Sequence, residues 1–276
     1  MHPIRRVSVV STGSVAIHPE HVARTRSPLG WWLLTSRRWT KPRPINVYVI
    51  EHDEGLVLFD TGQDRASVTD RDYFSRGPVG FLYSRLARFT IGADQTLRAQ
   101  LAGLGYDIAD VRVAVISHLH QDHIGGLPEL AHAEIVVASA ELATARKLLA
   151  ELDGYLTKHI FLPGLSWKMI DGELDLFADG SLTVLPTPGH TPGSLSMLVD
   201  QPGIPPLLFV GDLTYDVALL ERGHIPGVGS RAGLEASTRR VAELAVRHPG
   251  LVVLAAHDPA ARGLLAAAVA SPLVTE

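Results

Sequence analysis

The feature that most constrains this chain is a dense run of histidines and one aspartate at the end of a predicted strand. The run directly follows the aliphatic segment Val111–Ile116 and reads Ser117-His118-Leu119-His120-Gln121-Asp122-His123-Ile124-Gly125-Gly126. Imidazole nitrogen and carboxylate oxygen are the ligands that zinc and neighbouring transition metals take when no thiolate is available. In an extended segment His118 and His120 point the same way and can hold one metal. Asp122 and His123 lie where the chain turns and can reach a second metal.

Three further residues stand at comparable places later in the chain. His190 lies in the turn Thr187–Ser194, Asp212 ends a short apolar run, and His257 follows the apolar run Leu251–Ala256. At each of these places a sheet edge would present side chains to a cleft. Taken singly, a histidine in a turn is usually solvated, and an aspartate at a strand end often caps a helix. The order of the three after the first run gives them their weight as ligands.

Composition excludes several other chemistries. The chain of 276 residues has no cysteine, which excludes disulfides, thiolate nucleophiles, Fe–S clusters and cysteine-based zinc sites. The formal net charge is −4 and the isoelectric point is near 6.3. A mildly acidic chain gives no electrostatic reason to expect a nucleic acid or an anionic membrane as partner.

The ends of the chain predict neither export nor membrane insertion. Arg5 and Arg6 precede the apolar stretch Val7–Val10, which stops at once in Ser11-Thr12-Gly13. A signal peptide needs roughly 7–15 apolar residues and a membrane helix needs about 20. We therefore expect a protein of the cytoplasm.

Hydrophobic patterning predicts a layered α/β protein. Short β-branched and aliphatic runs between turn signals predict strands at Arg5–Val10, Ile45–Glu51, Leu56–Asp60, Val111–Ser117, Glu134–Ala138, Leu182–Pro186, Ser194–Val199, Leu207–Val210 and Leu251–Ala255. Helices are predicted at Asp94–Gly105, with an acidic N-cap, and at Ser139–Leu152, Arg231–His248 and Pro259–Ala270. This order indicates antiparallel or mixed sheets. No linker-like stretch interrupts the chain, so we expect one domain over residues 1–276.

Two segments, Thr12–Pro44 and Gln63–Gly92, lack clear periodicity and are predicted as long functional or mobile loops. The first contains the apolar cluster Trp31-Trp32-Leu33-Leu34. Such a cluster either lines a substrate channel or covers a partner subunit in a homodimer, unless it simply packs on the core.

The ordered set of histidines and aspartates resembles the metallo-β-lactamase superfamily. The match also includes Asp60-Thr61-Gly62 at an early strand end and the turn Pro188–Gly193, and it spans roughly residues 5 to 260. The resemblance implies a four-layer αβ/βα sandwich, with two mixed β-sheets flanked by helices and two metal ions at the sheet edges.

The resemblance also implies a role for each residue. Carried over position by position, the ligands would be His118, His120 and His190 for the first metal, Asp122, His123 and His257 for the second, and Asp212 for both. Asp60 would support the ligand loop from behind. Zinc is the metal that these ligand types favour, with cobalt, manganese or iron as alternatives. A water shared by two such ions becomes hydroxide near neutral pH and can attack an ester, lactone, thioester, amide or phosphoester.

Several branches of the superfamily fit less well. The commonest β-lactamases use a cysteine at the second metal, and flavodiiron proteins need a fused flavodoxin domain. Nucleases of the superfamily have extra domains or basic surfaces. Thioesterases of the glyoxalase II type share the ligands but end in a longer basic helical region, whereas this chain ends soon after His257.

The chain is most similar to the N-acyl-homoserine lactone lactonases, which interrupt bacterial quorum sensing. Those enzymes have a tyrosine three residues after the bridging aspartate, and here Tyr215 follows Asp212 at that spacing. The resemblance makes Asp122 and Tyr215 the expected catalytic residues and a small acyl lactone or ester the expected substrate. Gln121 departs from the family pattern and affects the predicted shape of the cleft floor. The alternatives are a broader hydrolase of lactones, esters, thioesters or organophosphates, and a metal-binding module without activity.

Overall fold

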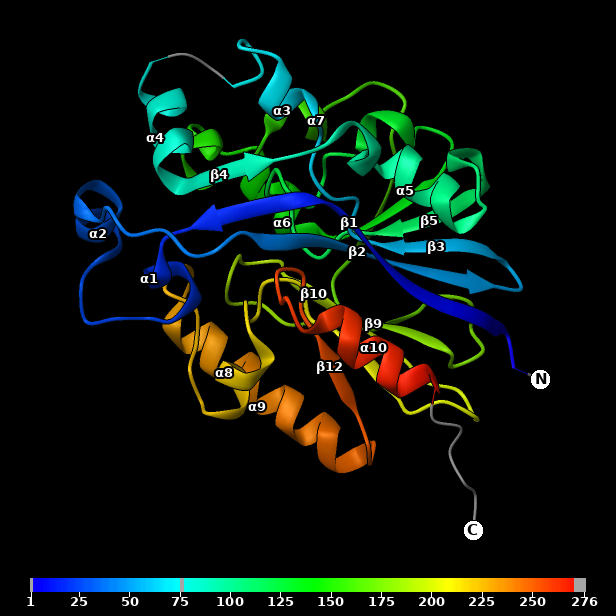
Figure 1. Cartoon of the computed structure of the whole chain (residues 1–276). Helices are drawn as coiled ribbons and strands as arrows, with labels where there is room; N and C mark the ends of the chain where they lie inside the picture. The colour runs from blue at the N-terminus through cyan, green and yellow to red at the C-terminus, as the bar shows by residue number, and fades with distance from the viewer. Residues whose placement is uncertain (1, 75–76, 271–276) are drawn as a thin grey trace.

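Two β-sheets face one another across a central apolar core, and helices cover the outer face of each sheet (Figure 1). The computed structural model describes residues 2–74 and 77–270. The expected four-layer sandwich of two mixed sheets flanked by helices is confirmed.

The larger sheet has seven strands. In spatial order they are β4 (Ala87–Thr90), β1 (Ile4–Ile17), β2 (Arg43–His52), β3 (Gly55–Phe59), β5 (Val111–Val115), β6 (Glu134–Ala138) and β7 (Ser166–Ile170). The pairs from β4 to β3 are antiparallel, and those from β3 to β7 are parallel. Because β3, β5 and β6 run the same way, the loops after β3 and β5 meet at one edge of the sheet.

The smaller sheet has five strands. In spatial order they are β12 (Val252–Leu254), β11 (Leu207–Phe209), β10 (Leu195–Val199), β9 (Leu182–Pro186) and β8 (Leu174–Asp175). Strands β11 and β12 are parallel, and the other pairs are antiparallel. The ends of β11 and β12 and the β9–β10 turn therefore lie on one side.

Strand β3 shows why the sheets are buried on both faces. Val57 and Phe59 pack in the core between the two sheets, whereas Leu56 and Leu58 pack beneath the helices. Side chains alternate between the two faces of a strand, so an almost wholly apolar strand requires cover on both sides.

The helices divide between the two outer faces. Helices α3 (Ala66–Thr69), α4 (Pro78–Leu86), α5 (Leu97–Leu104), α6 (Ser139–Ala145) and α7 (Thr157–Ile160) lie on the side of the larger sheet (Figure 1). On the side of the smaller sheet lie α8 (Val217–Glu221) and α9 (Arg231–Arg247), and α10 (Ala261–Ala270) packs into the central core. Helices α1 (Pro19–Val22) and α2 (Leu29–Thr35) stand beyond the end of β1 (Figure 1). Within the described ranges, no helix has the length and apolarity to cross a membrane.

Several predicted element bounds were wrong, and each has a local cause. The first loop was predicted to begin at Thr12, but β1 continues to Ile17 through a register shift between Ser11 and Ser14. Gly13 has a φ of 117° at that shift, so a turn-like sequence is accommodated as a bulge within the strand. The second loop also contains regular structure, namely α3, α4 and the edge strand β4. Strands β7 and β8 were not predicted.

Two predicted helices have different ends. The N-cap of α5 is Thr96, whose hydroxyl accepts a hydrogen bond from the Ala99 amide at 3.2 Å, and not an acidic residue. Helix α6 stops at Ala145, well before the predicted end at Leu152. Leu149 adopts a φ of 68°, which breaks the helical path before the 3₁₀ turn Ala150–Asp153.

Candidate metal centre

The loops that follow four strands, β5, β9, β11 and β12, bring the predicted ligands together at one edge of the sandwich, which we call the ligand edge. The β5–β6 loop supplies His118, His120, Asp122 and His123, the β9–β10 turn supplies His190, and the ends of β11 and β12 supply Asp212 and His257. These residues form three overlapping groups in which ligand atoms lie within 4.8 Å of one another.

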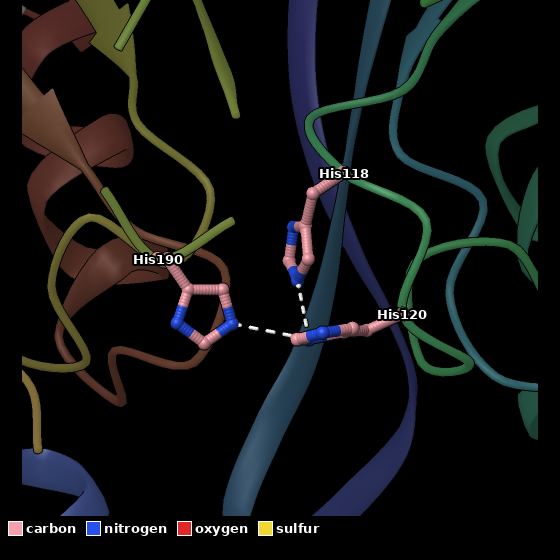
Figure 2. Close-up of side chains that lie close together, drawn as sticks. All are labelled: His118, His120 and His190. Carbon is pink, nitrogen blue, oxygen red and sulfur yellow. Dashed lines mark hydrogen bonds between the residues drawn. The ribbon is translucent and has the colours of Figure 1, made fainter. Parts of the chain in front are cut away.

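Three histidines converge on one point (Figure 2). Nε2 of His118 and Nε2 of His190 each lie 3.1 Å from Nδ1 of His120. Imidazole nitrogens around a tetrahedral zinc ion at 2.0–2.1 Å would be separated by roughly 3.3 Å. The group therefore has the spacing that a single cation needs.

A second group lies next to the first, and Asp212 faces both. Nε2 of His257 lies 3.5 Å from Asp122 Oδ2 and 3.4 Å from Asp212 Oδ1, and Nε2 of His123 lies 3.5 Å from the same Asp212 oxygen. The other oxygen of Asp212, Oδ2, lies 3.6 Å from Nε2 of His190 in the first group. One carboxylate thus directs an oxygen to each group, which is the arrangement of a bridging ligand.

The unpaired atoms of this site fit two cations. His123 Nε2 and Asp212 Oδ1 are buried without a hydrogen-bond partner in the described part of the chain. A buried polar atom without a partner is unfavourable, and a cation between these atoms would remove that penalty. The donor set of imidazoles and carboxylates, without sulfur, suits zinc and neighbouring divalent ions.

The electrostatics of the histidines agree with that fit. Burial, followed by the neighbouring histidines, lowers the pKa of His118 well below its usual range, and burial lowers the pKa of His190 to about 3. Both rings are therefore neutral, as metal binding requires. Burial opposes a charge on His123 as well, but the carboxylates of Asp60 and Asp212 raise its pKa well above the usual value. A metal ion at Nε2 of His123 would therefore take the place of the proton that these carboxylates favour.

Hydrogen bonds at the back of the rings select the nitrogen that faces the site. His257 Nδ1 donates to the Pro44 carbonyl at 2.9 Å, and His123 Nδ1 donates to Asp60 at 2.8 Å. In both rings this leaves the Nε2 lone pair for a metal. Asp60 also accepts from the amide and the hydroxyl of Ser117, at 2.7 and 2.9 Å. Asp60 has a φ of 64°, a strained conformation for a residue other than glycine, which aims its carboxylate at the ligand loop.

Glu141 is a buried residue that the sequence did not identify, and it connects the two loops that carry the first group. The Glu141 carboxylate accepts the Leu119 amide and the Gly193 amide, each at 3.0 Å, and the Tyr155 hydroxyl at 3.2 Å. Leu119 lies between two ligands and Gly193 lies three residues after His190. Glu141 is fully buried at the start of α6, where a glutamate in sequence normally indicates a solvated helix face. No sequence signal distinguishes it.

A cavity of about 410 Å³ opens directly onto the two groups. His120, Asp122, His190, Asp212 and His257 line its inner end together with Tyr215. The Tyr215 ring stacks on His257 with 5.6 Å between ring centroids. Burial, and then the charges of Asp212 and Asp122, raise the pKa of Tyr215 well above its usual range, so its hydroxyl keeps its proton and can donate. Gln121 also lines the cavity and accepts a hydrogen bond from the Gln63 amide at 3.2 Å.

Another part of the cavity lining, which we call the N-terminal wall, comes from β1, α1, α2, α4 and β4. Its residues are Val15, Ile17, His21, Leu29, Leu33, Leu82, Leu86, Ala87 and Phe89. The predicted cluster Trp31–Leu34 divides here: Leu33 is buried and lines the cavity, Trp32 is buried against other aromatic rings, and Trp31 and Leu34 are exposed. Leu33 is thus placed to line the channel, whereas Trp31 and Leu34 of the same helix are the residues available for a subunit contact.

Comparison with known proteins gives a consistent match. A family model described as the metallo-beta-lactamase superfamily matches residues 40–257. The N-acyl homoserine lactonase AttM of Rhizobium radiobacter is 33% identical over 223 residues, which cover 78% of this chain and 82% of that relative.

Solved structures show the same fold at lower identity. B. thuringiensis AiiA, with N-decanoyl-L-homoserine bound at its active site, has a TM-score of 0.77 and 23% identity, with 93% of this chain and 94% of that chain covered. AidC, described as a dizinc quorum-quenching lactonase with a bound product, has a TM-score of 0.64 and 16% identity, with 94% and 90% covered.

Proposed function

The chain belongs to the metallo-β-lactamase superfamily and is a metal-dependent hydrolase, and from that premise we propose that it opens the lactone ring of N-acyl-homoserine lactones. We further propose that it binds two divalent ions, zinc by ligand type, through His118, His120, Asp122, His123, His190, Asp212 and His257. The named lactonase at 33% identity supports the choice of substrate.

The observation that carries the proposal is the position of Asp212 at the inner end of the cavity. Its two oxygens face two ligand groups, and the same cavity continues to an apolar wall. A lactone with an acyl chain has the matching division into a polar reactive ring and an apolar tail. A cavity of this size with a few polar groups at one end is typical of a small-molecule site.

The residues of the chain would share the chemistry with the ions. When bound, the two ions would lower the pKa of a shared water and polarise the lactone carbonyl. The Tyr215 hydroxyl would donate a hydrogen bond to an oxygen of the substrate as negative charge develops there. Asp122, partly exposed to the cavity beside His257, would accept the proton that the attacking water loses and deliver it to the leaving alkoxide. The apolar wall would exclude water from the acyl chain.

The runner-up function is a broader hydrolase of other lactones, esters, thioesters or organophosphates, because the ligand groups alone do not choose among these substrates. The test is a panel of acyl-homoserine lactones, simple γ-lactones, aryl esters, a thioester and a phosphotriester, with the metal content of the same preparation measured. We expect close to two equivalents of metal and the highest kcat/KM on acyl-homoserine lactones. A higher kcat/KM on the aryl ester or the phosphotriester would contradict the proposed substrate.

Four finer points are also part of the proposal. The exposed Trp31 and Leu34 would contact a second copy of the chain in a homodimer, which analytical ultracentrifugation tests. Zinc as the native metal is tested by elemental analysis of the protein purified without added metal. A location in the cytoplasm is tested by fractionation. Organisation as one domain over residues 1–276 is tested by limited proteolysis.

A further inference from the structure

Two histidines three residues apart at the start of the N-terminal wall differ in their hydrogen bonds. The ring of His18 is completely buried, and its two nitrogens lie 2.7 Å and 2.9 Å from the carbonyl oxygens of Arg38 and Arg85. This ring links three segments of backbone, so its role within the fold is complete. His21, one turn further along, has no comparable role.

The imidazole of His21 lines the cavity and has unused hydrogen-bonding capacity. His21 is 5% exposed, and its Nδ1 is buried without a hydrogen-bond partner in the part of the chain that the structure describes. The edge of the Trp32 ring packs against it with 4.7 Å between centroids, which fixes its orientation. Burial, and then the charge of His18, lower the pKa of His21 to about 3. The ring is therefore neutral at ordinary pH, and one nitrogen can donate while the other accepts.

His21 lines the same cavity as the ligand residues His120 and Asp212. The other residues of the N-terminal wall are aliphatic or aromatic hydrocarbons: Val15, Ile17, Leu29, Leu33, Leu82, Leu86, Ala87 and Phe89. His21 is thus the polar member of a wall that is otherwise apolar in the described part of the chain.

We propose that His21 positions the substrate by a hydrogen bond to the amide that joins the lactone ring to the acyl chain. This inference rests on the proposed function. With the lactone ring at the ligand groups and the acyl chain on the apolar wall, the amide would lie between the two, and His21 is the polar residue of the wall that can meet it. An amide offers both an acceptor and a donor, and a neutral imidazole complements either.

The test compares two substrates that differ in the amide. One is an N-acyl-homoserine lactone and the other is a γ-lactone with an alkyl chain of equal reach. In His21→Phe, which keeps a ring against Trp32 but removes the hydrogen bond, kcat/KM should fall roughly threefold to tenfold more for the amide substrate than for the alkyl lactone. His21→Gln, which restores a donor and an acceptor, should recover much of that selectivity. Leu29→Ala, an apolar change in the same wall, should affect both substrates by a similar factor.

A binding measurement tests the same contact without turnover. In protein with ¹⁵N-labelled histidine, the ring-opened N-acyl-homoserine should shift the resonances that are missing from the His21→Gln spectrum. The 4-hydroxy acid of the alkyl lactone should shift them less. Equal loss on both substrates in His21→Phe, or unchanged His21 resonances with the bound amide product, would overturn the inference. Failure of the wild-type protein to hydrolyse either lactone would instead contradict the proposed function.

Discussion

The ligand edge and the N-terminal wall are the two sides of one cavity, and they are built differently. At the ligand edge, side chains are held from behind by directional bonds, such as Asp60 to His123 and the Pro44 carbonyl to His257. In the wall, the side chains of residues such as Leu33 and Phe89 are hydrocarbons that make apolar contacts only. Directional bonds fix atoms to a narrow geometry, which chemistry at a metal requires. Apolar packing tolerates exchange of side chains of similar volume, so we expect the wall to determine substrate preference with little influence on the metals.

The largest effect should come from the residue on which the ligand edge depends most. Asp212→Asn keeps the shape of the side chain but removes the charge that faces both ligand groups. We expect activity to fall by roughly a thousandfold or more and at least one metal to be lost, because several kcal/mol of charge stabilisation disappears. Steady-state kinetics and elemental analysis measure both quantities.

The matched control for this change is Asp216→Asn on the following segment. The Asp216 carboxylate accepts the Ala218 amide as the N-cap of α8, and asparagine caps helices equally well. The control should therefore keep both metals and most of the activity. Retention of two metals and most of the activity in Asp212→Asn would show that this aspartate does not bridge.

Tyr215 lies between the ligand edge and the N-terminal wall, since it packs on His257 and also on apolar residues of β1. Loss of one hydrogen-bond donor that acts in the transition state costs about 2.7–4 kcal/mol, and two nearby cations should reduce that value. Tyr215→Phe should lower kcat/KM for lactones roughly tenfold to several hundredfold, with metal content unchanged. The control is Tyr73→Phe. The Tyr73 hydroxyl is also buried, and it has no hydrogen-bond partner in the described residues. A wild-type rate in Tyr215→Phe would make the tyrosine structural.

Glu141 tests whether support from behind matters as much as the ligands themselves. Glu141→Gln weakens the bonds to the amides of Leu119 and Gly193, which position the loops of the first histidine group. Changes of this kind typically lower metal affinity or activity about 10–100-fold. Competition with a chelator should show one metal weakened more than the other. Glu243→Gln, the same change at an exposed position of α9, should leave the affinities unchanged, and equal affinities in both variants would refute the role of Glu141.

The contrast between the two sides also explains what could be predicted from the sequence. The candidate ligand residues could be predicted from the sequence because few residue types bind metals and because these residues follow predicted strands. The fold class was visible because strands such as β3 and β6 are almost continuously apolar. The role of Glu141 could not be predicted because nothing in the sequence indicates that a single glutamate in a helix is buried.

The N-terminal wall could not be predicted from the sequence for a different reason. Its residues come from segments that are far apart in sequence, and only the tertiary fold places α2 beside α4 (Figure 1). In β1, just before the wall, the strand was predicted to end near Ser11-Thr12-Gly13. The strand continues because a bulge preserves the pairing of β1 with β2. His21 lies within the segment Thr12–Pro44, which was predicted as a loop. Its hydrogen-bonding state follows from burial, which no local pattern records.

The smallest effect, and the most selective, should come from the wall itself. Leu33→Ala removes methyl groups that face the cavity, and burial of one methylene is worth about 0.8 kcal/mol, or roughly fourfold in kcat/KM. A substrate chain long enough to reach Leu33 should lose several-fold, and a short chain should lose less, without any change in metal content. Val246→Ala is the matched control because Val246 lies on α9, outside the cavity lining, and is 82% exposed. If Leu33→Ala lowers kcat/KM equally for all chain lengths, the wall does not determine the preference for acyl chains.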